Sequence, residues 1–493
     1  MEDDLINLCL DNHAMMDVDT TRAIKQELSE HFSFYVDGYK FMPAYKSRAW
    51  DGKIRLFNMN TSEINVGLYN QVKLFAKERG YRVEHSDHEK YGSLQTTTNI
   101  PRETIEQFIE TLGIPYTPHS YQVDAIKHAI DNKRCVLISP TGSGKSLIAY
   151  VLMRWFLLHN DSKILIIVPT TGLVEQMIGD FEDYGYSREK CHAIYSGKDK
   201  TTSKRVVVST WQSIYKLPRP WFAKYTHIIG DECHGFKAKS LSSIMNKSWN
   251  ASHRIGLTGT LDGTQTNELV LVGLFGPVFQ VTTTKERIDE DTLSKLDISI
   301  LHLKYPEHIK KDFGKKDYAS EIKFLINYQP RNKFIANLAT TLPGNTLVLF
   351  RFVKDHGKVL FDLIEPKMDN DRKCFYIHGS TAVSDRDAVR AIVEKQTNAV
   401  IVASMGTFST GINITNLHNI VFANPVKGQI KVLQSIGRSL RKSTNGANAH
   451  LYDIADDISY GKRKNHALRH SAARVEIYQK EQFPFSFYEV DLK

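Results

Sequence analysis

The segment that most constrains the fold is residues 138–146, Ile-Ser-Pro-Thr-Gly-Ser-Gly-Lys-Ser, which joins an apolar run to a helical pattern. Gly142 and Gly144 leave the backbone N–H groups uncovered, so these groups can surround a phosphate at the N-terminus of the helix. In such a loop Lys145 reaches the outer phosphates, and the hydroxyl of Ser146 is a ligand for Mg²⁺. The segment predicts a strand, a phosphate-binding loop and a helix in succession, although short motifs also match ordinary turns by chance.

Apolar runs of strand length alternate with helical patterns on both sides of this loop. Strands that alternate with helices are typical of a parallel sheet with crossover helices. We therefore expect two α/β domains of similar size in tandem, at residues 99–284 and 285–455. The runs lie at 135–138, 164–168, 205–209, 227–230 and 254–257 in the first domain, and at 346–350, 373–377, 399–403 and 419–423 in the second.

The two ends of the chain depart from this alternation. Residues 1–98 contain short helical and strand-like patterns, which predict a small α+β domain, and the polar stretch 91–99 indicates a linker. Residues 456–493 contain one helical pattern and predict a short helical segment. The helical patterns are at 21–31, 69–79 and 464–479, and the strand-like runs at 32–36 and 54–57.

Composition limits the possible partners and compartments. The net charge of +9 favours an anionic partner, nucleic acid before membrane, although this charge is modest for 493 residues. Five scattered cysteines without a Cys-x-x-Cys pair argue against a disulfide framework or a zinc site and fit a reducing cytoplasm. The start of the chain is acidic, and no run of 18 residues is apolar and uncharged, so we expect neither a signal peptide nor a membrane span.

Two adjacent carboxylates follow the apolar run 227–230. In a parallel sheet the strand ends deliver side chains to one edge, so Asp231 and Glu232 would lie near the phosphate loop. Asp231 can hold Mg²⁺ through water, and Glu232 can orient and deprotonate an attacking water. His234 is placed to relay between the nucleotide and a neighbouring motif. Such an acidic turn is common alone, but about ninety residues after a phosphate loop it predicts a hydrolytic site.

A third feature is a pair of arginines in the second α/β domain. Arg438 and Arg441 are three residues apart and would share one face of a helix. Positive charge on the outer phosphates stabilises the transition state of phosphoryl transfer. The nucleotide would then lie in a cleft between the two domains. Taken alone, however, an ordinary basic helix face explains these arginines better.

Together these motifs resemble those of the superfamily-two helicases, in the order that the family has them, over residues 118–442. The resemblance implies two tandem RecA-like motor domains that use ATP and Mg²⁺. Ser139, which replaces the first glycine of the strict loop pattern, is ordinary in this superfamily. The matching segments are Thr141-Gly-Ser-Gly-Lys-Ser146, Asp231-Glu-Cys-His234, Leu257-Thr-Gly-Thr260 and Gln434-Ser-Ile-Gly-Arg-Ser-Leu-Arg441 (motifs I, II, III and VI), with Tyr121-Gln122, Val168-Pro-Thr170, Ser209-Thr-Trp-Gln212 and Ala403-Ser-Met-Gly-Thr-Phe-Ser-Thr-Gly411 beside them.

The resemblance implies a role for each matching residue. The nucleotide would be bound by Gln122, Thr141, Gly142, Ser143, Gly144, Lys145, Ser146, Asp231 and Gly411, with Ser146 and Asp231 as the metal ligands. Catalysis would rest on Glu232 as the general base with Asp231, Lys145, Gln434, Arg438 and Arg441. His234, Thr258 and Thr260 would couple hydrolysis to movement. Nucleic acid would lie along Pro169, Thr170, Thr210, Arg351 and Thr410.

The N-terminal domain carries a narrower resemblance. Phe34-Tyr-Val-Asp-Gly-Tyr-Lys-Phe-Met-Pro43 and Trp50-Asp-Gly-Lys-Ile-Arg-Leu-Phe57 are similar to the start of the UvsW helicases of large bacteriophages. This resemblance implies a DNA helicase with RecG-like activity on forks, four-way junctions, D-loops and R-loops, including branch migration, fork regression and annealing, in recombination, repair and replication. It also implies action as a monomer on branched and single-stranded DNA in the host cytoplasm. A single-strand binding protein or a recombinase is the candidate protein partner.

Residues 38–82 are locally basic, with nine basic and three acidic side chains interleaved with aromatic ones. Basic groups bind phosphate, and exposed aromatic rings stack on unpaired bases. We expect Arg48, Trp50 and Lys53 to contact nucleic acid. Most of the aromatic residues are better explained as the core of a small domain, whereas core and contact explain Trp50 equally well.

Two other functions share many of these features. An RNA helicase or a restriction-type duplex translocase has the same motor motifs, and these residues do not separate DNA from RNA. A nucleotide-gated clamp that anneals strands would also bind ATP. A clamp need not retain Lys145, Asp231, Glu232, Arg438 and Arg441 together, so their presence favours a motor.

Overall fold

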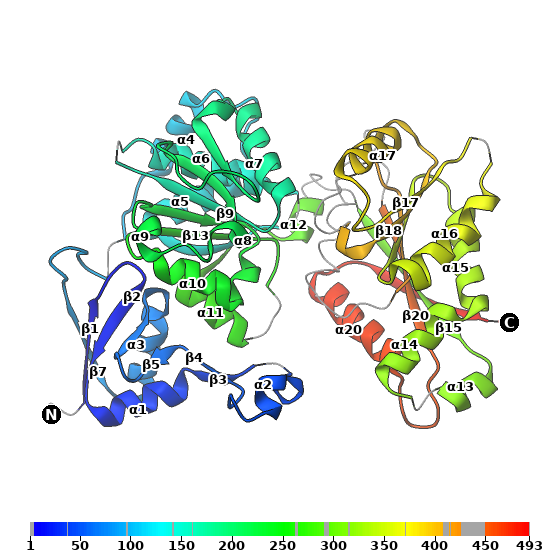
Figure 1. Cartoon of the computed structure of the whole chain (residues 1–493), viewed down its shortest axis with the longest axis horizontal. Coiled ribbons are helices and arrows are strands. Elements are labelled where there is room, and N and C mark those ends of the chain that lie inside the picture. The colour runs from blue at the N-terminus through cyan, green and yellow to red at the C-terminus, as the bar shows by residue number, and fades with distance from the viewer. Residues whose placement is uncertain are drawn as a thin grey trace. The chain divides into compact units, whose positions relative to one another are not determined.

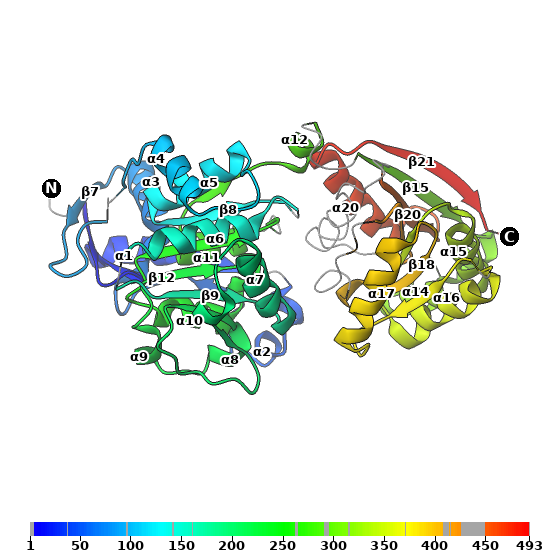
Figure 2. The same cartoon turned by 90° about the horizontal axis from the view of Figure 1, so that it is seen from above.

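The computed structural model describes residues 4–36, 38–94, 97–140, 142–159, 161–261, 265–289, 295–313, 316–369, 371–407, 414, 416–424 and 449–492. They form two compact units, one up to Val281 apart from Pro140–Gly142, and one from Thr282 onward (Figures 1 and 2). Within the described ranges, no helix combines the length and the apolar character needed to cross a membrane.

The first unit contains the parallel sheet that the alternating pattern predicts. Its seven strands have the order β10-β11-β9-β12-β13-β8-β14, and every neighbouring pair is parallel. The expected runs 164–168 and 227–230 coincide with β9 and β12, and the other three runs differ by one residue at one end or at each end. The strands are β8 (Arg134–Ile138), β9 (Ile164–Val168), β10 (Cys191–Ile194), β11 (Val206–Thr210), β12 (His227–Gly230), β13 (His253–Thr258) and β14 (Val278–Gln280).

Helices cover both faces of this sheet because alternate strand residues enter two separate cores. In β8, Cys135 and Leu137 join one core, and Val136 joins the other. Strands buried on both faces are continuous apolar runs in the sequence, which explains why they were recognisable. The first face is covered by α4 (Arg102–Thr111), α5 (Ser120–Asn132), α6 (Lys145–Phe156) and α7 (Thr171–Asp183), and the second by α8 (Trp211–Ile214), α9 (Arg219–Phe222), α10 (Lys239–Lys247) and α11 (Gln265–Phe275) (Figure 2).

The N-terminal α+β domain has a mixed sheet with the order β5-β6-β2-β1-β7, in which only β1 and β7 are parallel. Both expected helices are present, and the longer one ends at Gly80 in a left-handed conformation (φ +76°), which favours glycine. The elements are β1 (Leu5–Leu10), β2 (Met15–Asp19), α1 (Arg22–His31), β5 (Phe57–Asn58), β6 (Glu63–Asn65), α3 (Tyr69–Arg79) and β7 (Arg82–Ser86).

A separate two-stranded sheet, β3 (Ser33–Tyr35) and β4 (Lys53–Arg55), projects from this domain. A short turn of 3₁₀-helix, η1 (Tyr39–Phe41), and α2 (Pro43–Lys46) connect its two strands. Figure 1 shows this part of the chain, which we call the β3–β4 module, extending away from the mixed sheet.

The N-terminal domain packs directly on the first motor domain within the first unit. At Gly67 the backbones approach so closely that a Cβ would lie 1.9 Å from the carbonyl oxygen of Val272 in α11. Nδ2 of Asn65 donates to Oδ1 of Asn246 (3.0 Å), and the backbone N–H of His13 donates to the carbonyl of residue 249 (3.0 Å). These contacts fix one domain on the other.

The second unit is also built on a seven-stranded parallel sheet, with the order β17-β18-β16-β19-β20-β15-β21. It therefore has the predicted α/β class. The strands are β15 (Leu296–Lys304), β16 (Thr346–Phe350), β17 (Cys374–Ile377), β18 (Val400–Ser404), β19 (Asn419–Phe422), β20 (Ala449–Asp457) and β21 (Phe485–Asp491), with α12 (Thr284–Asp289), α13 (Glu307–Phe313), α14 (Tyr318–Asn327), α15 (Gln329–Thr341), α16 (Lys358–Ile364), α17 (Val383–Lys395) and α20 (His466–Lys480).

The C-terminal segment is more than a helix. The helical pattern 464–479 is confirmed as α20, but the chain then forms β21, which pairs with β15 at the edge of the sheet. The sequence did not predict this strand because most of its side chains are exposed, so it lacks a continuous apolar run.

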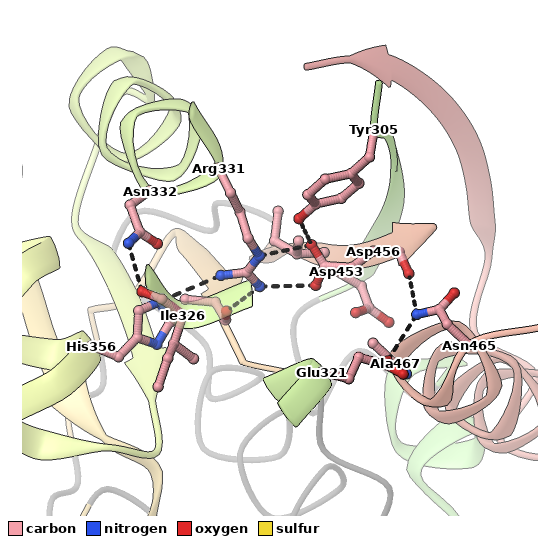
Figure 3. Close-up of polar contacts among 12 residues, drawn as sticks. Tyr305, Glu321, Ile326, Arg331, Asn332, His356, Asp453, Asp456, Asn465 and Ala467 are labelled. Atoms are coloured by element: carbon pink, nitrogen blue, oxygen red, sulfur yellow. Dashed lines mark hydrogen bonds and ion pairs between the residues drawn. The ribbon is translucent and has the colours of Figure 1, made fainter. Parts of the chain in front are cut away.

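A buried polar network anchors the end of β20 (Figure 3). The guanidinium of Arg331 in α15 donates to both carboxylate oxygens of Asp456, Nε to Oδ1 at 2.7 Å and Nη2 to Oδ2 at 3.0 Å. Tyr305 also donates to Asp456 (2.8 Å), and Arg331 donates to the carbonyl of Ala423 (2.7 Å). Both charged side chains are fully buried, so the pair joins α15 to the ends of β19 and β20.

Candidate functional site

The phosphate-loop segment has the backbone that its glycines predict. Gly142 and Gly144 both have left-handed conformations, with φ +83° and φ +80°, which favour glycine. A Cβ on Gly144 would lie only 2.2 Å from Nε2 of Gln122, so a larger residue there would displace the end of this side chain. Before the turn, the N–H of Ser139 donates to the carbonyl of Thr258 (2.8 Å), which fixes the loop to the end of β13.

The side chains of the loop point back over it. Nζ of Lys145, the first residue of α6, donates to the carbonyl of Ser139 at 3.1 Å. Oγ of Ser146 lies 3.1 Å from the hydroxyl of Tyr184. Ser139 is buried, and its hydroxyl is hydrogen-bonded to that of Ser143. The serine at the first loop position therefore stabilises the turn.

Gln122 clamps the start of α5 to the loop. Its Nε2 donates to the carbonyl of Ser143 at 2.8 Å, and its Oε1 accepts from the N–H of His119 at 2.8 Å. The hydroxyl of Tyr121 donates to the same carbonyl of Ser143 (3.3 Å). The structure thus places Gln122 against the loop, and its contact with adenine stays a prediction.

Asp231 lies at the carboxyl end of β12 with its N–H donated to Ile167 (2.9 Å). Burial, and then the charge of Glu232, raise the pKa of Asp231 to about 7, while Lys145 opposes the shift. Oδ1 of Asp231 is buried and has no hydrogen-bond partner among the described residues. A hard cation prefers such oxygen ligands, so the carboxylate of Asp231 and the hydroxyl of Ser146 fit Mg²⁺.

Glu232 is the first of four residues that are linked by polar contacts. It has a left-handed backbone (φ +48°), which is uncommon for a residue other than glycine and often marks a functional turn. Its Oε2 lies 3.4 Å from Nδ1 of His234, which lies 3.0 Å from Oγ1 of Thr258. Thr258 in turn donates to the carbonyl of Thr260 (2.9 Å). The structure brings these four predicted residues together.

Three predicted nucleic-acid contacts lie at the carboxyl ends of two neighbouring strands, β9 and β11. Thr170 accepts a hydrogen bond from an N–H in the first turn of α7 and so caps this helix. Nε2 of Gln212 donates to the carbonyl of Pro169 (3.2 Å) and links the two strand ends. Thr210 is only 5% exposed, so its side chain offers little surface to nucleic acid. Gln212, which the motif contains but to which we assigned no role, is better placed.

Arg351 lies in the second unit, directly after β16. Its side chain is exposed, and Nη1 donates to the hydroxyl of Tyr318 at 3.4 Å. An exposed arginine at a strand end is available for a phosphate contact.

The β3–β4 module has a basic and aromatic surface. Trp50 is half-buried and donates from Nε1 to the carbonyl of Lys53 (2.8 Å), whose own Nζ lies 4.9 Å from the ring centroid of Tyr35. Arg48 is exposed with a left-handed backbone (φ +59°). Phe41 is 80% exposed, so this ring is not part of the core that we expected most of the aromatic residues to form. Composition alone did not distinguish it.

Six predicted site residues lie outside the described residues. Their roles therefore stay predictions, and the arginines of motif VI are among them. They are Thr141, Thr410, Gly411, Gln434, Arg438 and Arg441.

Three family models match successive parts of the chain. Residues 5–86 match "DNA helicase UvsW, N-terminal", residues 115–263 match "Type III restriction enzyme, res subunit", and residues 330–443 match "Helicase conserved C-terminal domain". Their order agrees with a small N-terminal domain followed by two motor domains.

Individual relatives resemble the chain over its full length or over the motor. The ATP-dependent DNA helicase uvsW of Enterobacteria phage T4 is 35% identical, over 96% of this chain and 97% of the relative. The crystal structure of T4 UvsW covers 99% of this chain and all of its own, with a TM-score of 0.52 and 34% identity. The DNA 3'-5' translocase XPB2 of Sulfurisphaera tokodaii is 23% identical, over 70% of this chain and 84% of the relative.

Proposed function

We propose that this chain, which belongs to the UvsW family of ATP-dependent DNA helicases, uses ATP hydrolysis to remodel branched DNA such as forks, four-way junctions, D-loops and R-loops. The remodelling includes branch migration, fork regression and annealing, in recombination, repair and replication. The protein acts as a monomer on DNA in the host cytoplasm. A single-strand binding protein or a recombinase is its candidate partner.

Within this proposal the first unit binds the nucleotide. Lys145 and the loop amides hold the phosphates, and Asp231 and Ser146 hold Mg²⁺, which would neutralise charge on the phosphates. Glu232 deprotonates the attacking water. The orphaned Oδ1 of Asp231 is the observation that supports the metal.

The single observation that carries the branched-DNA proposal is the exposed ring of Phe41, which follows Lys40 in the β3–β4 module. A junction contains bases at the branch point that can unstack, and stacking on an aromatic side chain contributes about 1–3 kcal/mol per base. In the same module Lys40, Lys46 and Arg48 line a hollow of about 450 Å³, together with Tyr45, Trp50 and Asp51. The module therefore combines rings for bases with cations for phosphates.

The test compares ATPase and unwinding rates on forked DNA, a four-way junction, linear duplex and single-stranded RNA. For Phe41→Ala we expect junction unwinding to fall about tenfold, while ATPase stimulated by single-stranded DNA stays within about twofold. Leu74→Ala is the matched control, because Leu74 is also exposed in the N-terminal domain but carries no ring. Equal junction-unwinding rates for Phe41→Ala and the unmodified chain would show that the module does not recognise branches.

The alternatives predict other outcomes of the same comparison. An RNA helicase would be stimulated more by single-stranded RNA than by any branched DNA. A restriction-type translocase would prefer the linear duplex. A nucleotide-gated clamp would anneal strands without steady ATP turnover.

A further inference from the structure

A cavity of about 370 Å³ lies in the first unit at the amino ends of β8 and β13. The phosphate-loop segment follows the carboxyl end of β8, so the cavity and the loop are at opposite edges of the sheet. The walls come from the N-terminal domain, from the linker after it and from the first motor domain. Asn70 and Lys73 line it from α3, and Asn132, Lys133 and Arg134 line it from the motor domain.

Arg134, a residue of the cavity lining, has an incompletely paired guanidinium. Its Nη2 donates to the carbonyl of His13, but Nη1 is buried and has no hydrogen-bond partner among the described residues. A buried charged donor without a partner costs several kcal/mol or draws in a counter-ion. The position therefore favours an anion.

A second buried arginine nearby shows what complete pairing looks like. Arg254 donates from Nε, Nη1 and Nη2 to three carbonyl oxygens around the end of α10, at distances of 2.6–3.1 Å. Its positive charge is thus solvated by backbone dipoles. Arg134 donates to one such carbonyl, so its guanidinium has fewer hydrogen-bond acceptors than that of Arg254.

The charges around the cavity are of one sign. Its lining includes Lys73, Lys133 and Arg134 and, within the described ranges, no carboxylate. Burial lowers the pKa of Arg134 to about 10, and no acidic group offsets that shift. Burial, and then the charge of Arg134, also lower the pKa of His13 to about 3, so this histidine adds no positive charge near neutral pH.

The cavity wall is shaped by close backbone approach. Gly276 has φ +118°, and a Cβ on it would lie 2.7 Å from both Cβ and the carbonyl oxygen of Arg134. Glycine thus leaves room at this wall beside the backbone and Cβ of Arg134. The amides of Asn70 and Asn132 and the hydroxyl of Ser252 complete a polar lining that can donate to oxygens.

We propose that this cavity binds a phosphate group, held by Arg134 and Lys133 from the motor domain and by Lys73 from the N-terminal domain. The occupant bridges the two domains and stabilises their packing, in addition to the direct contact at Gly67. Its source is either free phosphate or a phosphodiester of the DNA strand. This site is separate from the ATP site and does not depend on the branched-DNA proposal.

The first arm of the test measures inorganic phosphate binding to the full chain carrying Lys145→Ala, which weakens phosphate binding at the loop. Thermal unfolding is recorded in phosphate and in chloride at equal ionic strength. We expect phosphate to raise Tm, and Lys73→Gln to weaken the apparent affinity about fivefold or more. Lys77→Gln, also exposed on α3 but absent from the lining, should leave the affinity unchanged.

Arg134→Met gives a second variant, since it keeps the aliphatic stem and removes the guanidinium. We expect it to abolish the phosphate-dependent rise in Tm. The proposal would be overturned if Lys73→Gln and Lys77→Gln bound phosphate equally well and showed equal DNA binding in the second arm, because Lys73→Gln is an exposed substitution that does not endanger folding.

The second arm identifies the source. The affinity of the chain for single-stranded DNA is measured across a salt series. If a DNA phosphate fills the cavity, Lys73→Gln lowers the slope of log K against log salt by about 0.7. If free phosphate fills it, Lys73→Gln changes the phosphate affinity but not this slope.

Discussion

Nδ1 of His234 lies 3.0 Å from Oγ1 of Thr258, and this contact joins the acidic turn after β12 to the end of β13. Glu232 lies 3.4 Å from the same histidine nitrogen, so the contact connects the proposed general base to a neighbouring strand. The backbone carbonyl of Thr258 also accepts a hydrogen bond from the N–H of Ser139 in the phosphate loop. Thr258 is thus hydrogen-bonded to both the acidic turn and the phosphate loop.

We predict that Thr258→Val separates hydrolysis from movement. Valine keeps the shape of threonine but cannot hydrogen-bond to His234, and Thr258 is fully buried. ATP turnover should stay within about twofold, while base pairs unwound per ATP should fall several-fold, because the hydrogen bonds of the hydroxyl to His234 and Thr260, each worth about 1 kcal/mol, are lost. Both rates are measured on the same forked substrate.

The control for this prediction is Thr111→Val on α4, an exposed threonine distant in sequence from the motifs. It should change neither rate. A parallel loss of ATPase and unwinding in Thr258→Val would instead mean that the contact supports chemistry and not coupling.

We predict that Glu232→Gln binds ATP with nearly unchanged affinity but hydrolyses it about 10²–10⁴-fold more slowly, because an amide cannot accept the proton of the attacking water. The substitution keeps the shape of the side chain at its left-handed position (φ +48°). Nucleotide affinity is measured by titration and turnover by phosphate release. Glu175→Gln, on α7, is the matched control. Normal turnover in Glu232→Gln would assign the proton transfer to another group.

The sequence predicted the parallel sheets, and the proximity of the phosphate loop to the acidic turn, for one physical reason. Parallel strands buried on both faces are continuous apolar runs, and functional residues follow their carboxyl ends. Lys145 and Asp231 could therefore be placed near each other from their positions after such runs, whereas Thr258 was assigned through the family resemblance. The contacts of Ser139 and Gln122 could not, because they depend on how α5 and the loop meet in space.

Half-exposed elements were the ones that the sequence did not predict. Strand β21 has exposed residues along most of its length, including Phe487, and joins β15 from a distant part of the chain. Phe41 is exposed although aromatic residues are usually buried, and no periodicity in a short turn indicates which ring is exposed. The cavity at Arg134 combines residues from six separate stretches of the chain, so no local sequence pattern indicates it.

We predict that Arg331→Met destabilises the second unit by about 3–5 kcal/mol, because it leaves the fully buried carboxylate of Asp456 without its charged partner. The double variant Arg331→Met with Asp456→Leu should recover much of this loss, since both charges are then removed. Chemical denaturation of the full chain, followed by a probe in the second unit, measures the free energy of unfolding.

An exposed pair supplies the comparison. Nζ of Lys358 lies 2.7 Å from Oδ1 of Asp362, with both side chains about half exposed. Lys358→Met should cost less than about 1 kcal/mol. If Arg331→Met cost no more than Lys358→Met, the buried network in Figure 3 would not hold the unit together.

We predict that acid weakens the first unit through His227. Burial lowers the pKa of this histidine to about 3, and its ring stacks on Phe156 (4.2 Å) and His253 (4.6 Å). In the unfolded chain a histidine has a pKa near 6.5. Between these two values the unfolded state binds a proton that the folded state does not, so stability falls as the pH falls. From pH 7 to pH 5.5 this site alone removes about 1 kcal/mol.

His227→Phe keeps an aromatic ring in the stack and removes the proton site. The free energy of unfolding of the first unit should therefore change about 1 kcal/mol less between pH 7 and pH 5.5 than in the unmodified chain. His308→Phe is the control, because His308 is exposed on α13 in the other unit. Urea unfolding at the two pH values measures the difference. An unchanged pH dependence in His227→Phe would show that other buried groups, such as His253, carry the acid sensitivity.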